Sequence, residues 1–457
     1  MNDEAPAGLQ RTLKRRHVQM IAIGGVIGAG LFVGSRVVIE AAGPAAVVSF
    51  AITGALVVLV MRMLGEMAVA HPAVGGFYEY VRLALGERAG FLTGWMYWYF
   101  WVIVVAIEAV AGADLLRDWL PAVPPWRFTL GLTVLFMGLN LLSVRSWGET
   151  EFWFASIKVA AIVAFLAAGS AWVLGLWPGE SGGFANLTAN GGFMPNGVGP
   201  VLTGAVAATG FYFGAELVTL AAAESAEPEQ AVASAMQSVI SRVLVFYIGS
   251  IFIVVTILPW NDPGIARPYA SVLEKLGIPA AAQLMNAVIL IAVLSALNSG
   301  LFASSRMLMS LARRGDAPRA FAMLDARGVP VFAILAGSAF AYVAVVMSYV
   351  SPDRVFKFLV DSYGTVAIFV YVLIALAQLR LRRQLEREAP EKLQLKMWAF
   401  PGLTIAAIAA MLSIVAAMAF IPAQQAPLAF GVVSALVLLG AYELRRFRAP
   451  SDESDVT

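Results

Sequence analysis

Long apolar stretches follow one another along almost the whole chain, with short polar segments between them. Crossing the hydrocarbon core of a bilayer takes about 20 apolar helical residues. Twelve stretches are long enough, at 18–39, 45–69, 92–114, 127–144, 152–176, 199–222, 237–258, 280–311, 330–350, 356–379, 397–420 and 427–446. The pattern predicts an all-α integral membrane protein with twelve transmembrane helices.

The connections are short and rich in turn residues, as in PAVPPW (121–126) and PWNDPG (259–264). They indicate one transmembrane domain over 18–446, with tails at 1–17 and 447–457, and no second domain behind a linker.

Composition narrows the classes of function. The chain is 60% hydrophobic and 13% charged, with no cysteine and two histidines, whereas soluble domains are about a quarter charged. An enzyme needs a nucleophile beside a base, or a cluster of metal ligands, and the sequence offers neither pattern. We therefore expect no enzymatic activity, no cofactor, no metal site and no nucleic-acid partner.

The basic residues predict the orientation. Of 31 lysines and arginines, seven fall on the outer side when the N-terminus is cytoplasmic, Lys158 lies inside a span, and the other 23 lie at cytoplasmic ends and loops. Cytoplasmic loops of membrane proteins carry such an excess of positive charge. An even number of spans then places both termini in the cytoplasm, and a bacterial inner membrane is the expected location.

Glycines cluster in two stretches that lie five spans apart. Residues 24–35 read GGVIGAGLFVGS, and residues 203–216 read TGAVAATGFYFGAE. Glycine disfavours a helix by about 1 kcal/mol per residue relative to alanine, so both stretches are candidates for helix breaks that line a watery cavity. For the first stretch, close packing through small residues four apart is the alternative.

The five-span offset divides the chain into repeats at 18–176 and 199–379, with extra helices at 397–446. Because five is odd, the repeats have opposite orientations, as in many transporters. A break exposes N–H groups on one half-helix and C=O groups on the other, which suit a carboxylate and an ammonium. A zwitterionic substrate fits both.

Three ionisable residues lie well inside predicted spans, where a charge is costly and commonly functional. Glu108 has no evident partner and is expected to face the transport pathway. Lys158 either snorkels to the cytoplasm or loads and releases a proton. Glu216 directly follows the second glycine cluster, and either bonds freed N–H groups or carries a proton. Arg62 and Glu66, four residues apart, are expected to form an ion pair near the membrane surface.

Six segments resemble the bacterial amino acid permeases of the amino acid-polyamine-organocation superfamily. They are LKRRHVQMIAIGGVIGAGLFVGS (13–35), MRMLGEMAVAHPAVGGFYEY (61–80), GETEFWFASIKVAAI (148–162), GGFMPNGVG (191–199), FGAELVTLAAAESAEPEQAV (213–232) and LNSGLFASSRMLMSLARRGDAP (297–318). FWVIVVAIEA (100–109) and VFKFLVDSYG (355–364) are most similar to the 4-aminobutyrate permease branch.

The resemblance implies a five-plus-five inverted repeat with two extra helices, and a substrate bound between broken spans 1 and 6. Main-chain N–H groups near Gly28, Ala29 and Gly30 would take the substrate carboxylate, and carbonyls near Val26, Gly210 and Phe213 the amine. Ile27, Glu108, Phe211 and Gly214 complete the expected binding residues. A lysine at the position of Lys158 implies proton symport in place of sodium, and Glu216 is the second candidate for proton coupling.

One motif departs from the family. Span 6 usually reads FSFxG(A/L)E, whereas this chain has GFYFGAE, so that Gly210 stands where a phenylalanine is common. Either Phe211 or Tyr212 replaces that ring, or the pocket is larger.

These observations predict a secondary transporter that imports an amino acid or 4-aminobutyrate by alternating access. An uncoupled exchanger and a channel-like facilitator are the alternatives, because pores also use glycines and isolated charges.

Overall fold

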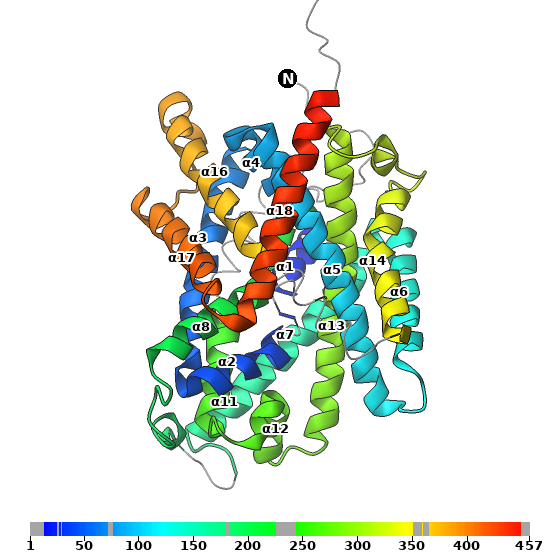
Figure 1. Ribbon diagram of the computed structural model, residues 1–457. Helices are drawn as coiled ribbons and strands as arrows, with labels where there is room; N and C mark the ends of the chain where they lie inside the picture. The colour runs from blue at the N-terminus through cyan, green and yellow to red at the C-terminus, as the bar shows by residue number, and fades with distance from the viewer. Residues whose placement is uncertain are drawn as a thin grey trace, which may run out of the picture.

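The computed structural model describes residues 13–24, 27–28, 30–71, 76–178, 183–222, 224, 244–350, 359 and 365–448. The regular elements in these ranges are helices (Figure 1), which confirms the predicted all-α class. Eight helical stretches are long and apolar enough to cross a membrane: Gly30–Ala70, Glu87–Trp119, Pro125–Leu142, Val144–Val173, Val198–Ala221, Ala281–Arg313, Val331–Val350 and Gln424–Phe447. Leu244–Ile257 and Gly402–Met418 are apolar but shorter.

The first predicted span is divided among three helices. α1 covers Arg15–Gly24, the π-helical turn η1 covers Gly30–Gly34, and α2 covers Ser35–Ala42. The 3-10 turn η2 (Gly43–Ala45) then leads directly into α3 (Ala46–Ala70). The connection between spans 1 and 2 is therefore a tight turn, as short as the sequence predicted.

The sixth predicted span is divided in the same way, into α8 (Val198–Ala208), the 3-10 turn η4 (Thr209–Tyr212) and α9 (Leu217–Ala222). Between the two divided spans lie α4 (Phe77–Leu85), α5 (Glu87–Trp119), α6 (Pro125–Leu142), α7 (Val144–Val173) and η3 (Ala185–Leu187). The elements after α9 are η5 (Leu244–Ile248), α11 (Gly249–Ile257), η6 (Pro263–Ala266), α12 (Pro268–Lys275), α13 (Ala281–Arg313), η7 (Arg319–Ala322), α14 (Val331–Val350), α16 (Val366–Glu388), η8 (Pro390–Lys392), α17 (Gly402–Met418) and α18 (Pro422–Arg448).

α7 begins well before the apolar stretch predicted at 152–176. The hydroxyl of Ser143 accepts a hydrogen bond from the N–H of Ser146 at 3.0 Å, which caps the first turn. The polar run at 148–151 is consequently helical and points some of its side chains into the bundle.

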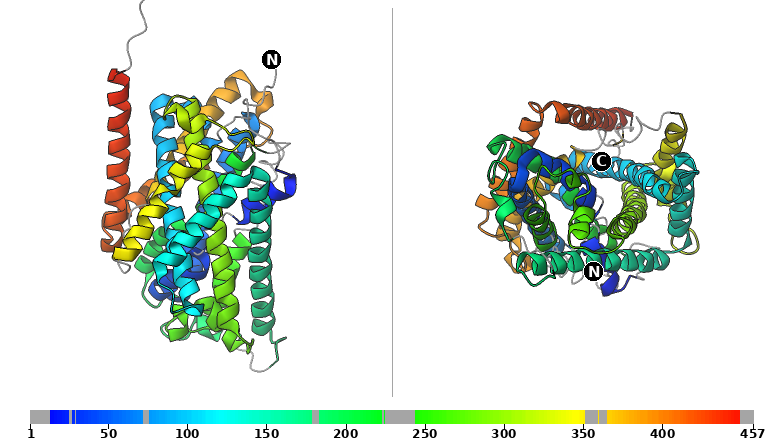
Figure 2. Two further views of the ribbon diagram at one scale, coloured as in Figure 1. Left: turned by 90° about the vertical axis from the view of Figure 1, so that its right-hand side faces the viewer. Right: turned by 90° about the horizontal axis from the view of Figure 1, so that it is seen from below.

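α5 and α13, the two longest helices, pack along each other, and α7 packs against both α13 and α1. α18 runs along the outside of the bundle (Figure 2), and only 11% of its most apolar stretch is buried. Its apolar surface is the kind that a lipid bilayer covers.

Several helix ends that carry arginine meet at the upper end of the bundle in Figure 1. Arg88 at the start of α5 pairs with Glu443 near the end of α18 at 3.3 Å. Asp316, which follows α13, accepts hydrogen bonds from Arg82 of α4 and Arg445 of α18, each at 2.7 Å. We call this end, defined by these five residues, the basic end.

The ion pair predicted between Arg62 and Glu66 is wrong. Glu66, near the end of α3, pairs with Arg382 of α16 at 2.7 Å and accepts a hydrogen bond from Gln378 at 2.8 Å. Arg62 donates instead to the main-chain carbonyl of Lys396 at 2.9 Å. Because α16 covers the end of α3, the buried carboxylate takes its partner from the covering helix and not from its own helix.

Candidate functional site

The first glycine cluster coincides with an interruption of helical structure. α1 ends at Gly24 and η1 begins at Gly30. Of the residues between them, Ile27 is buried, and Gly28 accepts a hydrogen bond from the N–H of Leu31 at 3.2 Å. A Cβ atom added to Gly28 would meet no other atom within 4 Å, so this glycine borders open space. The predicted binding residues Val26 and Ala29 lie outside the described residues.

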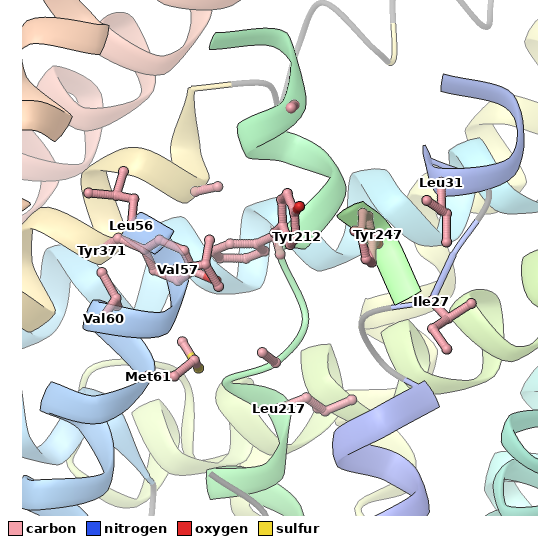
Figure 3. Close-up of a cluster of buried hydrophobic side chains, with 14 of the residues drawn as sticks. Ile27, Leu31, Leu56, Val57, Val60, Met61, Tyr212, Leu217, Tyr247 and Tyr371 are labelled. Carbon is pink, nitrogen blue, oxygen red and sulfur yellow. The ribbon is translucent and has the colours of Figure 1, made fainter. Parts of the chain in front are cut away.

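The second glycine cluster also ends a helix. After η4, Phe213 is extended, with φ −70° and ψ 141°, and Gly214 has φ +119°, which glycine adopts without steric cost. α9 then starts at Leu217. The turns η1 and η4 are in contact, and Figure 3 shows the two breaks, one passing Ile27 and the other between Tyr212 and Leu217.

Glu216 occupies the break in span 6. Its fully buried carboxylate accepts hydrogen bonds from the N–H of Gly214 at 3.1 Å, from Tyr97 of α5 at 3.2 Å and from Tyr371 of α16 at 3.0 Å. All three donors are neutral. The carboxylate thus bonds an N–H group within the break, which is one of its two expected roles. Sequence reasoning missed both tyrosines, since neither is near Glu216 in the chain.

Phe213 is enclosed by aromatic rings. Its ring centroid lies 4.2 Å from that of Phe100 and 5.0 Å from that of Tyr371. Only 7% of Phe213 is exposed. Its carbonyl, one of those expected to bind the substrate amine, belongs to a residue whose side chain is fixed by α5 and α16.

Phe211 lies against the first broken span. A Cβ atom on Gly30 would come within 2.7 Å of the Phe211 ring, and one on Gly34 within 2.5 Å. Tyr212 turns elsewhere: it stacks on Tyr247 with ring centroids 4.3 Å apart. Of the two aromatic residues considered as substitutes for the family phenylalanine, Phe211 is therefore the one beside η1.

Gly210 has no atom within 4 Å of an added Cβ, as at Gly28. The glycines of the first cluster consequently have two different environments. Gly30 and Gly34 permit close packing of an aromatic ring, whereas Gly28 borders open space. Close packing, one of the two interpretations considered for that cluster, therefore applies to Gly30 and Gly34.

Lys158 does not snorkel to the membrane surface. It lies near the middle of α7, is 1% exposed, and donates a hydrogen bond from Nζ to the hydroxyl of Ser295 on α13 at 2.8 Å. An ammonium in such a place needs compensating polar groups. The ammonium therefore lies inside the bundle, with a hydrogen-bond partner on a neighbouring helix.

Those polar groups come from Glu151, which sequence reasoning missed. Its fully buried carboxylate accepts hydrogen bonds from the hydroxyl of Ser295 and, at 3.2 Å, from the amide of Asn298. The available signal was spacing: Glu151 precedes Lys158 by seven residues, which places both on one face of a helix. We had assigned it to a polar segment outside the span.

Glu108, on α5, has a buried carboxylate oxygen, Oε2, for which no hydrogen-bond partner exists among the described residues. Glu108 and Lys158 are close enough to interact electrostatically, and Lys158 also interacts with Glu151. The ammonium therefore has a carboxylate on each of two helices as a neighbour. Within the described ranges, no three His, Asp or Glu side chains are grouped so that they could hold a metal ion.

Known proteins match this chain in sequence along nearly its whole length. The chain is 50% identical over 455 residues to the gamma-aminobutyric acid permease of Bacillus subtilis (strain 168), covering 99% of this chain and 97% of the relative. It is 45% identical over 447 residues to the gamma-aminobutyric acid permease of Escherichia coli (strain K12), covering 96% of each. The aromatic amino acid transport protein AroP of Corynebacterium glutamicum is 41% identical over 417 residues, with 90% of each chain covered.

Among solved structures, the manganese transporter of Eremococcus coleocola superposes with a TM-score of 0.58 at 14% identity, covering 97% of this chain and all of that one. This likeness concerns the fold alone. The family model for amino acid permeases matches residues 17–444. With its several membrane-length apolar helices, the chain is a multi-pass membrane protein that belongs to the amino acid permease family.

Proposed function

We propose that this protein imports 4-aminobutyrate, or a related amino acid, across the bacterial cytoplasmic membrane by alternating access coupled to proton symport. Two relatives that are 45% and 50% identical are gamma-aminobutyric acid permeases. The observation that carries the coupling is the position of Lys158, an ammonium inside the bundle that interacts electrostatically with carboxylates of α5 and α7.

The proposed architecture has twelve spans in two inverted repeats and two extra helices, with the basic end in the cytoplasm. Interruptions at corresponding places, in the first and sixth predicted spans, support the repeat. The arginine-rich helix ends support the orientation, because cytoplasmic segments of membrane proteins are enriched in basic residues.

The proposed substrate site lies between the breaks. Main-chain N–H groups near Gly28, Ala29 and Gly30 bind the carboxylate, and carbonyls near Val26, Gly210 and Phe213 bind the amine, with Ile27, Phe211 and Gly214 beside them. The open space at Gly28 and at Gly210 supports this assignment. Glu108 offers the free carboxylate oxygen that an amine farther from the substrate carboxylate requires.

In the proposed cycle, an external proton and the substrate enter an outward-open cavity. The half-helices close on the substrate, and the protein then opens to the cytoplasm. A membrane potential of 100 mV supplies about 2.3 kcal/mol for each charge moved inward, and about 1.4 kcal/mol corresponds to a tenfold gradient. One proton carried with a neutral zwitterion therefore supports roughly 50-fold accumulation from the potential alone.

Lys158 is the proposed proton carrier. For Glu216, which we proposed as a second coupling residue, the three neutral donors support a role in holding the break of span 6. Glu216 is retained as a coupling residue only if its neutral replacement affects driven uptake without affecting exchange.

The test is uptake of labelled 4-aminobutyrate, with each common amino acid as competitor, into proteoliposomes that hold the purified protein. An alkaline interior without sodium should drive accumulation that a protonophore abolishes. Replacing Lys158→Met should abolish accumulation while substrate binding persists. A requirement for sodium with indifference to the pH gradient would contradict proton symport.

The two alternatives give distinct results in the same vesicles. An uncoupled exchanger would show uptake stimulated by internal substrate but no accumulation under the pH gradient. A channel-like facilitator would show neither stimulation by internal substrate nor saturation.

A further inference from the structure

We propose that Glu151 is the residue that accepts the coupling proton from Lys158, through the hydroxyl of Ser295, and later releases it at the basic end. The proposal rests on the proton symport proposed above. When Lys158 releases the coupling proton, another group must accept it, and the proposal assigns that group.

The contacts form a continuous path. Lys158 Nζ donates to Ser295 Oγ at 2.8 Å, and the Ser295 hydroxyl donates to Glu151 Oε1. Lys158 and Glu151 lie on the same face of α7, and their Cα atoms are about 10 Å apart along the axis at 1.5 Å per residue. The lysine side chain and the serine hydroxyl span that distance, so the path needs no added group.

The transfer is balanced at each atom. The Lys158 ammonium gives one proton to Ser295 Oγ, while Ser295 gives its hydroxyl proton to Glu151 Oε1. The products are a neutral amine, an unchanged serine and a neutral carboxylic acid. Two buried charges disappear together, which removes the cost of keeping them away from water.

The described hydrogen-bonding groups beside Glu151 include amides, which do not titrate. Asn298 of α13 donates to Glu151 Oε2 at 3.2 Å, and its own amide oxygen accepts a hydrogen bond from Asn140 of α6 at 3.2 Å. Glu108 of α5 is a further charged group that acts on Lys158 in the part of the chain that the structure describes. The ammonium therefore interacts with two carboxylates, and the hydrogen-bonded path leads to that of Glu151.

The direction of release follows from the helix ends. α13 finishes at the basic end, so Phe302 lies one turn closer to that end than Asn298. Trp147, which packs on Phe302, precedes Glu151 by one turn of α7. Their rings stack in parallel, 3.7 Å between centroids and 10° between planes. This stacked pair lies between Glu151 and the basic end, and its separation in an inward-open state would expose the carboxylate to water.

A merely structural role for Glu151 is the competing explanation, because the carboxylate also ties α13 to α7. Gln at position 151 keeps oxygen and nitrogen atoms for hydrogen bonds but cannot accept a proton. Replacing Glu151→Gln therefore separates the two roles. Glu149→Gln is the matched control, since Glu149 lies in the same polar run but at the surface, paired with Arg16 at 2.6 Å.

Two assays on the full chain in proteoliposomes provide the readout: 4-aminobutyrate uptake driven by an alkaline interior, and exchange with internal 4-aminobutyrate without a gradient. We expect E151Q to lower driven uptake about tenfold or more, and exchange, which needs no net proton release, by less than about threefold. The E149Q control should match the wild type in both assays.

The serine provides an independent test in case E151Q does not fold. Ser295→Ala should reproduce the loss of driven uptake with exchange retained, whereas Ser295→Thr, which keeps the hydroxyl, should retain driven uptake. If the Ser295 side chain only filled space, the larger threonine should not retain driven uptake better than alanine does.

Each outcome has a defined meaning. Driven uptake in E151Q and S295A that equals the wild type would overturn the proposed path and leave proton symport intact. Equal loss of driven uptake and exchange in folded E151Q would also overturn it, in favour of a structural role. Absence of pH-driven uptake in the wild type would contradict the proposed function itself.

Discussion

In the break of span 6, the carboxylate of Glu216 accepts a hydrogen bond from the N–H of Gly214 and two more from tyrosines of α5 and α16. At the break of span 1, Gly28 borders open space, and the nearby contact is a ring that packs on Gly30 and Gly34. One break is therefore held by hydrogen bonds to a buried acid, and the other is supported from one side by an aromatic ring.

This difference indicates which of the two breaks already has its hydrogen-bond partners within the protein. A buried N–H group needs a partner, and in span 6 the protein supplies it. In span 1 the open space at Gly28 leaves room for a partner from outside, as the open space at Gly210 does in span 6. In the proposed substrate site we call the half that Glu216 holds the fixed half-site and the half at Gly28 the open half-site, and the two together suit a ligand that completes the second break on binding.

The largest effect should come from Glu216→Ala. It leaves the N–H of Gly214 and two buried hydroxyl groups without their acceptor, and each unsatisfied group costs about 1–3 kcal/mol. We expect a loss of about 3 kcal/mol or more in the free energy of unfolding, and loss of both exchange and driven uptake. Thermal unfolding in detergent micelles and the two vesicle assays measure these effects.

Glu216→Gln is the control for that variant, since it keeps one oxygen acceptor and most of the volume. It should unfold at a temperature between those of the wild type and E216A. If E216A were as stable as the wild type, the carboxylate would not hold the break, and the comparison between the two spans would fail.

The next effect concerns the aromatic support of span 1. Gly34→Ala places a Cβ atom 2.5 Å from the Phe211 ring, and overpacking of this kind costs about 1–3 kcal/mol. Because the backbone of Gly34 is right-handed helical, with φ −65°, alanine is otherwise suited to the position. The expected destabilisation is measured as a lower unfolding temperature in micelles.

A double variant isolates the cause of that loss. Phe211→Leu removes the atoms that clash, so G34A should cost much less in the F211L background than in the wild type. An equal cost in both backgrounds would show that Phe211 does not support span 1.

A smaller effect is expected from Tyr97→Phe and Tyr371→Phe. Each removes one hydroxyl donor to Glu216 and leaves the other two donors in place, so each should cost about 1 kcal/mol. Exchange should persist in both single variants. Their double variant should lose more than the sum of the two, because it leaves the buried carboxylate with one donor, whereas each single variant leaves it with two. The unfolding temperatures of the four proteins test this.

Hydropathy and glycine content predicted the helices and the two interruptions, because both depend on local sequence. The partners of the buried acids were beyond that reasoning. Nothing in the sequence around Glu216 indicates Tyr97 or Tyr371, and Glu66 pairs with a residue of α16 and not with Arg62 four positions away. Such pairs depend on which helices become neighbours in the bundle.

The polar run at 148–151 shows a different limit. Hydropathy treats a polar turn of helix and a loop alike, so the predicted span begins at residue 152 and leaves out Glu151, which lies inside α7. The Ser143 cap and the seven-residue spacing to Lys158 were both present in the sequence. Helix capping and side-chain spacing therefore add information exactly where an apolar pattern ends, at polar segments that another helix covers.

The smallest effect on stability, and the one that tests the open half-site, is expected from Gly28→Ala. Its φ lies outside the left-handed region, and the added methyl group meets no atom within 4 Å, so the free energy of unfolding should change by less than about 0.5 kcal/mol. The methyl group would instead occupy the space proposed for the substrate carboxylate. We expect a KM for 4-aminobutyrate uptake raised about tenfold, against an unchanged unfolding temperature.

Gly131→Ala, which is also free of contacts but lies on α6, should change neither quantity. A normal KM in G28A would mean that the open space at Gly28 does not receive the substrate, and the distinction between a fixed and an open half-site would lose its functional meaning.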